Sequence, residues 1–361
     1  MTDTRPLRKG WTTGACATAA ARACLTALRT GAFPDPVEIV LPRGLTPAFA
    51  LNRHALADDG GSATASVIKD AGDDPDVTHG AEIVVTLRPL PPGSGLRFCA
   101  GDGVGTVTKP GLPLPPGEPA INPGPRAMIA DNLALEAAGG LVDVEVTVSI
   151  PGGEALARKT MNPRLGIVGG LSVLGTTGVV VPYSCAAWIH SIHRGIDVAR
   201  AAGCAHLLAA TGNTSETAAR RLYPLPEEAL IDMGDFAGAV LKYLRRHPVD
   251  RLTLAGGLAK ISKLADGNMD LHSSRSRVNQ TALASVLADL GAPAAAVTAA
   301  GEAVTALAVL EIARDAGLER PFADLLCRRA REVALAVVAG HVAVEVIAFD
   351  RQGWEVGRAG P

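Results

Sequence analysis

Short runs of alternating hydrophobic and polar residues fill the first part of the chain, and this alternation predicts β-strands. Such runs are expected at residues 37–41, 64–69, 82–87 and 142–150. One long alanine-rich segment, residues 14–29, favours a helix instead. A single long helix among several short strands is typical of an α+β domain.

The second part of the chain follows a different pattern. Continuous apolar runs at residues 205–210, 229–232 and 251–255 are each followed by a loop and a helical segment. Such runs are typical of the buried parallel strands of βαβ units. After them, residues 278–338 are rich in alanine and predict helices, and residues 341–349 predict a closing strand.

The change of pattern near residues 151–153 indicates a domain boundary. We therefore expect an α+β domain at residues 1–155, followed by an α/β domain with a mostly parallel sheet at residues 156–361. The proline-rich stretch at residues 109–125 is long for a connection inside a compact domain, so we expect it to form a lid or a wall of a site.

Composition narrows the class of protein. The 361 residues are 48% hydrophobic, which is enough to bury sizeable cores. The net charge of −2 and the small number of aromatic residues argue against a nucleic-acid-binding protein. The six cysteines form no CxxC pair and are expected to be small buried side chains. No signal peptide or membrane-spanning stretch is recognisable, so a cytoplasmic protein that does not enter a membrane is expected.

Two glycine-rich loops carry the same Thr-Thr-Gly sequence. Thr12, Thr13 and Gly14 stand at the predicted start of the long helix, and Thr176 and Thr177 end a second glycine-rich stretch, residues 162–178. Hydroxyl groups and flexible backbone at a helix start can bind carboxylates or phosphates. The alternative is that the first loop is only a helix N-cap and the second only a packing turn.

The predicted parallel strands end in polar or glycine residues where a nucleotide-like ligand would lie. The candidates for contacts with such a cofactor are Gly212, Asn213, Thr214, Asp232, Gly234, Asp235, Gly256 and Gly257. No GxGxxG or Walker sequence is present, so the site would be non-standard. These glycines can also be explained as helix-entry turns, with Asp235 as an N-cap.

Residues 260–277 combine four cationic side chains with His272 and several serines. Lys260 and Lys263 in particular are candidates for binding a substrate with several carboxylates, although a solvated face explains them as well. His190 and His193 are spaced i, i+3 on a predicted helix, but two histidines fall short of a metal site, and no metal is expected.

Six blocks together resemble the cobalt-precorrin-5B C(1)-methyltransferase family (CbiD). They are KGWTTGACATAA (residues 9–20), GDGVGTVTKPG (101–111), INPGPR (121–126), NPRLGIVGG (162–170), LGTTG (174–178) and residues 260–272. The blocks occur in order over most of the chain. The segment at residues 183–194, with its two histidines, lies outside these blocks and is not matched to the family pattern.

The resemblance implies methylation of C-1 of cobalt-precorrin-5B by S-adenosylmethionine, giving cobalt-precorrin-6A in cobalamin biosynthesis. It also implies a fold unlike the common Rossmann methyltransferases. Because a tetrapyrrole precursor carries many carboxylate arms, Arg126 and Arg164, which lie within these blocks, become candidate substrate contacts. A small-molecule kinase and a non-catalytic tetrapyrrole carrier are the alternatives.

Two expectations about location follow. S-adenosylmethionine should bind mainly to the second domain, at the ends of the predicted parallel strands. The loops at residues 10–14 and 175–178 should face one cleft, with one loop contributed by each domain, because a site between domains needs walls from both.

Overall fold

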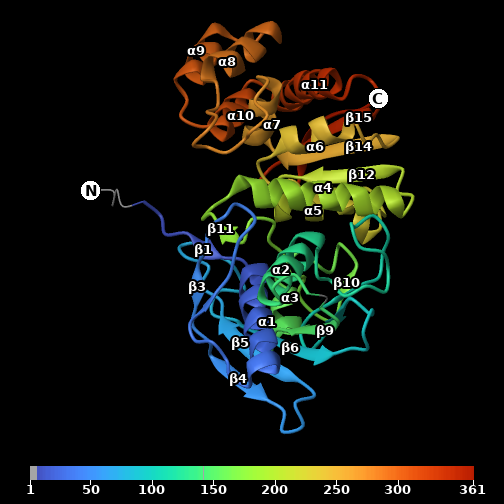
Figure 1. Ribbon diagram of the computed structural model, residues 1–361. Coiled ribbons are helices and arrows are strands. Elements are labelled where there is room, and N and C mark those ends of the chain that lie inside the picture. The colour runs from blue at the N-terminus through green and yellow to red at the C-terminus, as the bar shows by residue number, and fades with distance from the viewer. Residues whose placement is uncertain (1–5, 141) are drawn as a thin grey trace. The chain divides into compact units, whose positions relative to one another are not determined.

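The computed structural model describes residues 6–140 and 142–361, and the chain divides into two compact units, Met1–Cys185 and Ala186–Pro361 (Figure 1). The boundary expected after residue 155 falls inside the first unit. The reason is that two strands beyond it pair back: β10 (Ile167–Val168) with β8 (Thr106–Val107), and β11 (Val179–Val180) with β1 (Gly10–Trp11).

The first unit is built on a five-stranded sheet with the order β4-β5-β6-β9-β7. The strands are β4 (Arg53–Leu56), β5 (Ala63–Ile68), β6 (Glu82–Pro89), β9 (Val144–Ser149) and β7 (Leu96–Ala100). Neighbours are antiparallel except for β7 and β9, which are parallel. In β6, Ile83, Val85 and Leu87 are fully buried while the residues between them are partly exposed, as the sequence alternation predicts.

Helix α1 (Thr13–Thr30) packs on β5 and β6, and α2 (Pro123–Glu136) packs on α1. Residues 13–21 of α1 are all buried, and most are alanine, glycine or cysteine. Small side chains on every side let the sheet and α2 approach this helix closely. The remaining short elements are β2 (Val37–Glu38), β3 (Ala48–Phe49) and α3 (Gly153–Ala157). The first unit is therefore α+β, as expected.

The second unit contains a five-stranded sheet with the order β13-β12-β14-β15-β16. The strands are β12 (His206–Ala210), β13 (Leu230–Asp232), β14 (Arg251–Gly257), β15 (Ala343–Phe349) and β16 (Glu355–Ala359). The first four in this order are parallel, and β16 is antiparallel to β15. The expected α/β fold with a mostly parallel sheet is confirmed, and its strand order differs from the 3-2-1-4-5-6 order of the Rossmann fold.

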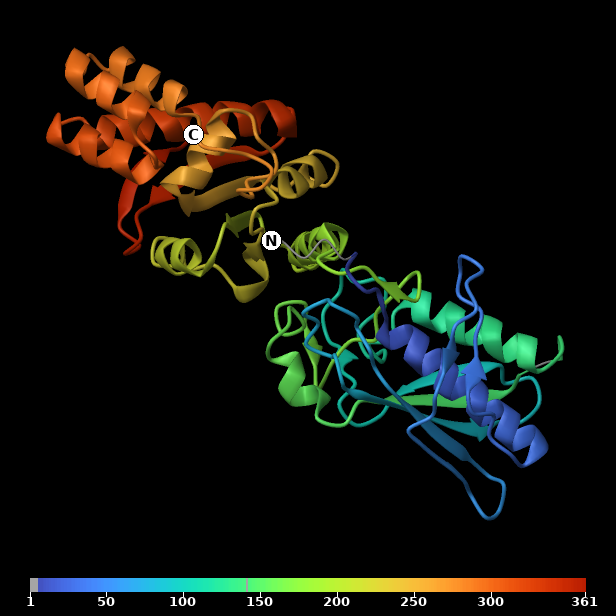
Figure 2. The same cartoon turned by 90° about the vertical axis from the view of Figure 1, so that its left-hand side faces the viewer.

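Helices cover both faces of this sheet. The elements are α4 (Cys185–Ala201), α5 (Asn213–Arg220), the 3-10 turn η1 (Glu227–Ala229), α6 (Ala237–Leu244), α7 (Leu258–Ala265), α8 (Gln280–Asp289), α9 (Ala294–Glu302), α10 (Ala306–Asp315) and α11 (Glu319–Val338). Helices α4, α6, α7 and α11 share one core with the sheet, whereas α5 packs on the other face. Helices α8 to α10 form a group that packs on α11 (Figure 2).

The connections place a topological switch point between β12 and β14. The chain leaves β12 into α5 on one face of the sheet and leaves β14 into α7 on the opposite face. Loops that diverge from neighbouring parallel strands open a crevice between them, where α/β proteins bind their ligands. The fold therefore predicts a ligand site at the carboxyl ends of these two strands.

Candidate functional site

The carboxyl ends of β12, β13 and β14 meet at one edge of the sheet in the second unit. Ala210 pairs with Asp232 on one side and with Ala255 on the other. All eight residues that the sequence suggested as cofactor contacts therefore belong to neighbouring strand ends. We refer to residues 211–214, 232–235 and 256–257 together as the strand-end site.

Two glycines leave the backbone of this site open. Gly212 and Gly257 are the N-cap residues of α5 and α7, and both have backbone angles that any residue adopts. A Cβ added at either position would meet none of the described atoms within 4 Å. Packing within the unit does not require glycine at these two positions, so they leave room for a group outside the chain. Gly256 differs, because its added Cβ would lie 3.0 Å from Thr211 Cγ2.

Lys260 joins the ends of the three strands. Its Nζ donates a hydrogen bond to the carbonyl oxygen of Thr211 at 2.9 Å and lies 3.0 Å from Asp235 Oδ1. Among the described residues, no group donates a properly aligned hydrogen bond to Asp235 Oδ1, although this atom is buried. The Asp235 side chain as a whole is 23% exposed, so its carboxylate can accept a hydrogen bond from a ligand hydroxyl.

Lys263 and His272 do not extend this site into a cationic clamp. The Lys263 side chain is 6% exposed, and its Nζ donates to the carbonyl oxygen of Leu271 at 2.8 Å. The Leu271 N–H in turn donates to the carbonyl oxygen of Asp235 at 2.8 Å. His272 is exposed, with its Nδ1 2.7 Å from Ser274 Oγ. Lys263 thus braces the segment behind Asp235.

The two Thr-Thr-Gly loops lie against each other, and both belong to the first unit. The Thr12 N–H donates to the carbonyl oxygen of Gly178 at 2.9 Å, and the Gly14 N–H donates to that of Leu174 at 3.0 Å. A Cβ added at Gly175 would overlap the Thr12 side chain. The loops are adjacent, as expected, but the expectation that each domain contributes one of them is wrong.

The hydroxyl groups of these loops have different surroundings. Thr12 Oγ1 caps α1 by accepting from the Ala15 N–H at 3.2 Å, and Thr177 Oγ1 donates to the carbonyl oxygen of Val179 at 3.2 Å. Thr13 is buried and Thr176 is exposed. Because the N–H groups of Gly14 and Ala15 already have acceptors, the helix start has fewer donors for an anion than its sequence suggests.

Arg126 holds the proline-rich loop at residues 109–125. Its Nε donates to the carbonyl oxygen of Ile121 at 2.7 Å, its Nη2 lies 2.8 Å from Glu118 Oε2, and its guanidinium carbon lies 5.2 Å from the centre of the Phe98 ring. These contacts anchor the loop to its own unit. Arg164 is half-buried in the segment before β10.

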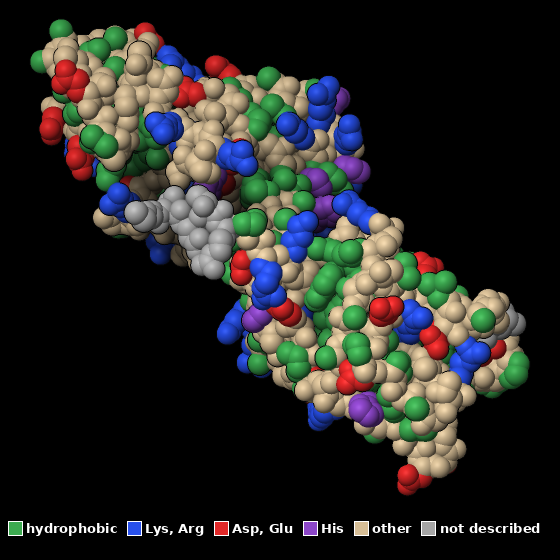
Figure 3. Space-filling view, turned by 60° about the vertical axis from the view of Figure 1, so that its left-hand side comes forward, with side chains coloured by type: hydrophobic (Ala, Val, Ile, Leu, Met, Phe, Trp, Pro, Cys, Tyr) green, Lys and Arg blue, Asp and Glu red, His purple; other side chains and the backbone are tan. Residues whose placement is uncertain are grey.

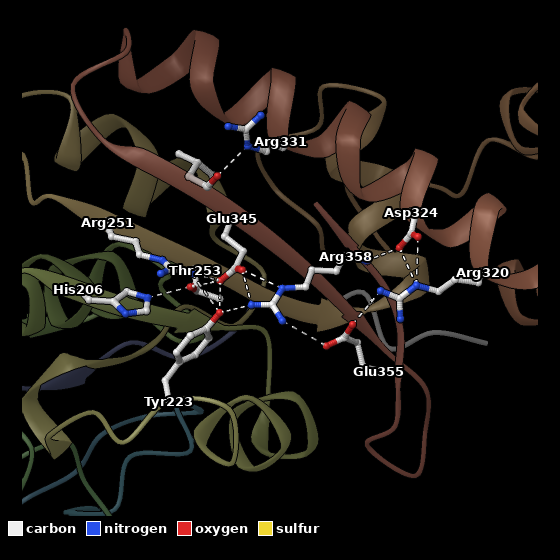
Figure 4. A network of polar contacts seen from close by, with 11 residues as sticks. His206, Tyr223, Arg251, Thr253, Arg320, Asp324, Arg331, Glu345, Glu355 and Arg358 are labelled. Atoms are coloured by element: carbon white, nitrogen blue, oxygen red, sulfur yellow. Dashed lines mark hydrogen bonds and ion pairs between the residues drawn. The ribbon is translucent and has the colours of Figure 1, made fainter. Parts of the chain in front are cut away.

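A buried polar network on the α5 face of the sheet was not predicted from the sequence (Figure 4). Glu345 on β15 is 1% exposed and accepts hydrogen bonds from Tyr223 Oη (2.6 Å), Thr253 Oγ1 (2.7 Å), Arg251 Nη2 (3.0 Å) and Arg358 Nη2 (2.6 Å). Burial opposes its ionisation, but these donors outweigh burial and lower the pKa of Glu345 to about 2. In the sequence, a glutamate within an otherwise apolar strand could have indicated this network.

Of the two histidines of α4, His190 is exposed and His193 takes part in packing. The His193 ring stacks on Tyr243 with 4.1 Å between ring centres, and Tyr243 stacks on His247 at 4.2 Å. Burial lowers the pKa of His193. Within residues 6–140 and 142–361, no three His, Cys, Asp or Glu side chains are grouped to hold a metal ion, and no helix is long and apolar enough to cross a membrane.

Charged side chains of both signs are interspersed over the face shown in Figure 3. This distribution agrees with the net charge of −2. On this face, recognition of a polyanionic ligand would therefore depend on local groups rather than on a large basic surface.

Comparison with known proteins identifies relatives along nearly the whole chain. The family model described as CbiD matches residues 1–182, and the model described as CbiD, C-terminal domain, matches residues 270–360. A cobalt-precorrin-5B C(1)-methyltransferase of Brucella anthropi is 59% identical over 96% of this chain and 94% of its own. A protein of the same name from a Bradyrhizobium species is 59% identical over 99% of this chain and 96% of its own.

A solved structure is also similar. The crystal structure of a cobalamin biosynthesis protein (cbiD) from Archaeoglobus fulgidus is 26% identical and covers 74% of this chain and 83% of its own, with a TM-score of 0.39. The family models and the sequence identities extend through both units and include each of the glycine-rich blocks. The chain belongs to the CbiD family.

Proposed function

We propose that this chain methylates C-1 of cobalt-precorrin-5B, with S-adenosylmethionine as the methyl donor, and yields cobalt-precorrin-6A in cobalamin biosynthesis. The observation that carries the proposal is the 59% identity, over nearly the whole chain, to relatives named for this reaction. The α/β second unit adds a topological switch point, where folds of this class bind nucleoside ligands.

We place the donor at the strand-end site, where the residues fit a nucleoside. The open backbone at Gly212 and Gly257 offers close approach, and the partly exposed Asp235 carboxylate can accept a hydrogen bond from a ribose hydroxyl. Lys260 holds Asp235 and the Thr211 carbonyl in place. Asp232, at the end of β13, is the second carboxylate of this edge.

The donor supplies an electrophilic methyl group on a sulfonium sulfur. The protein's task is then to align donor and acceptor and to exclude water, because positioning alone lowers the barrier of a displacement considerably. A strong general base is not obligatory for this chemistry, and no residue is assigned as one.

We infer that local cationic and hydroxyl groups bind the carboxylate arms of the acceptor. Thr176 remains a candidate because its side chain is exposed, and Arg164 remains one because of its place in a family block. Weaker candidates are Arg126, Thr12 and Lys263, because the side chain of each already forms a hydrogen bond within the protein.

The reaction itself can be tested with the purified chain, cobalt-precorrin-5B and S-adenosylmethionine. Mass spectrometry should show an acceptor that has gained one methyl group in place of a hydrogen, together with an equal amount of S-adenosylhomocysteine. A carrier would retain the tetrapyrrole without consuming the donor, and this result would refute the proposal.

Alanine at Gly212 or Gly257 is expected to weaken binding of S-adenosylhomocysteine roughly tenfold or more, because the added methyl group fills the space where the ligand approaches. Stability should hardly change, since the free protein has room for a Cβ at both positions. Isothermal titration calorimetry measures the affinity. Gly301→Ala in α9, where the added Cβ meets only Ala284 at 3.9 Å, is the matched control. If both test variants keep the wild-type affinity, S-adenosylmethionine does not bind at the strand-end site.

Lys260→Met is expected to weaken donor binding by about tenfold and to leave the KM for the acceptor nearly unchanged. The reason is that a charged donor to the Thr211 carbonyl and the counter-ion of Asp235 are lost together. Lys242→Met, at an exposed position of α6, controls for loss of positive charge. A raised KM with unchanged donor affinity would instead make Lys260 a contact for an acceptor carboxylate.

A further inference from the structure

The apolar stripe of α4 continues past the core to an exposed tryptophan. Ile192, Ile196 and Ala199 are buried against the sheet, with spacings of four and three residues. One turn earlier on the same face stands Trp188, which is 47% exposed. A large aromatic side chain at the end of a packed stripe would ordinarily be covered, so this one provides an apolar surface that the described residues leave open.

The indole of Trp188 lies at the carboxyl end of β13. A Cβ added at Gly234 would be 3.5 Å from the indole atoms Nε1, Cε2 and Cζ2, which is van der Waals contact. Gly234 has a φ of +53° and stands between Met233 and Asp235, directly after the strand. One edge of the ring thus rests on the strand-end site, and nearly half of the side chain stays exposed.

The order of the strands along the chain predicts which part of the ligand lies next to the indole of Trp188. The open glycine turn at Gly212 follows the first parallel strand, and Asp232 ends the second one about 20 residues later. In nucleotide-binding α/β folds a carboxylate at or just after the end of the second strand binds the ribose, so the base lies next to that strand end. That is where the indole of Trp188 lies.

We propose that Trp188 is a specificity residue for the donor and that its indole stacks on the adenine ring. The proposal rests on the placement of S-adenosylmethionine at the strand-end site. An aromatic face on one side of a planar base favours the adenine nucleoside over donors that lack a base. Trp188 lies at residues 183–194, outside the six family blocks.

Trp188→Ala and Trp188→Phe test the proposal through equilibrium binding of S-adenosylhomocysteine, measured by calorimetry. Stacking on a base predicts a Kd roughly 5- to 100-fold higher for the alanine variant and a value near that of the wild type for the phenylalanine variant, which keeps an aromatic face. Circular dichroism and thermal melting of both variants show whether the fold is kept. Equal Kd values for the alanine variant and the wild type would overturn the proposal.

Intrinsic fluorescence supplies a second measurement. The chain has three tryptophans, Trp11, Trp188 and Trp354. S-adenosylhomocysteine should change the emission of the wild-type protein and leave that of Trp188→Phe unchanged, and an equal change in both proteins would contradict stacking on Trp188. If the wild-type protein does not bind S-adenosylhomocysteine at all, the placement of the donor at the strand-end site is wrong. If it binds equally well with and without Trp188, only the role of Trp188 is wrong.

Discussion

Replacing Glu345 by glutamine should lower the free energy of unfolding of the second unit by about 3 kcal/mol, the lower end of the usual cost of removing one partner from a buried ion pair, because Glu345 is buried but its arginines are partly exposed. Glutamine keeps the shape of the side chain and removes its charge. Arg251 and Arg358, each with a side chain 35% exposed, would then lose their shared counter-ion. Urea denaturation followed by circular dichroism measures the change.

Glu319→Gln provides the matched control for this prediction. Glu319 pairs with Arg314, and their side chains are 31% and 56% exposed, so the pair is largely hydrated. Its loss should cost at most about 1 kcal/mol. Similar losses in the two variants would mean that the network around Glu345 stabilises the sheet no more than a surface pair does.

The pH dependence of the free energy of unfolding shows whether the charge of Glu345 or its shape stabilises the protein. Its pKa is about 2 in the folded protein and 4.5 when unperturbed, so its contribution is complete above about pH 4.5 and is lost as the pH falls towards 2. The stability difference between the wild type and Glu345→Gln should therefore narrow over that range. A difference that stays constant from pH 5 to pH 3 would assign the effect to packing.

Gly103→Ala is expected to cost more than about 4 kcal/mol and to prevent the first unit from reaching its native structure. Gly103 has a φ of +71°, and an added Cβ would overlap the carbonyl oxygen of Ile150 and lie 2.8 Å from the Gly153 nitrogen. Backbone atoms cannot move aside by changing rotamer. The Gly103 carbonyl also accepts from the Leu171 N–H at 2.9 Å, so any shift would propagate into a second glycine-rich segment.

Gly80→Ala isolates the part of this cost that comes from backbone conformation. Gly80 has a φ of +76°, and an added Cβ would meet none of the described atoms within 4 Å. Alanine there should cost only about 1 to 2 kcal/mol, the penalty of a left-handed conformation. Soluble yield and thermal denaturation of the two variants give the comparison. If both lose the same stability, close packing around Gly103 is not what requires glycine.

The sequence predicted the second unit's parallel strands to within a few residues. The runs at 205–210, 229–232 and 251–255 correspond to β12, β13 and β14, because strands buried on both faces are continuously apolar. The pattern did not reveal the edge strands β4, β7 and β16, and β4 and β7 have no buried residue. Edge strands face water on one side and are short, so their hydrophobic signal is weak.

The sequence likewise predicted only part of the candidate site. Strand ends followed by glycines and carboxylates mark a ligand crevice in any parallel sheet, so residues 211–214, 232–235 and 256–257 could be named from the chain alone. Trp188 could not, because its closeness to Gly234 depends on how α4 packs on the sheet. The burial of Lys263 and the cation pair around Glu345 depend on packing in the same way.

By itself the sequence determined the class of each unit, the family blocks and the presence of two Thr-Thr-Gly loops. Only the tertiary structure decided what these loops do: the Gly14 N–H donates to the carbonyl of Leu174, and Thr12 caps its own helix. The physical reason is the range of the interactions. Periodicity, propensity and turn chemistry act over a few neighbouring residues, whereas the partner of a donor is set by segments that meet only when the core packs.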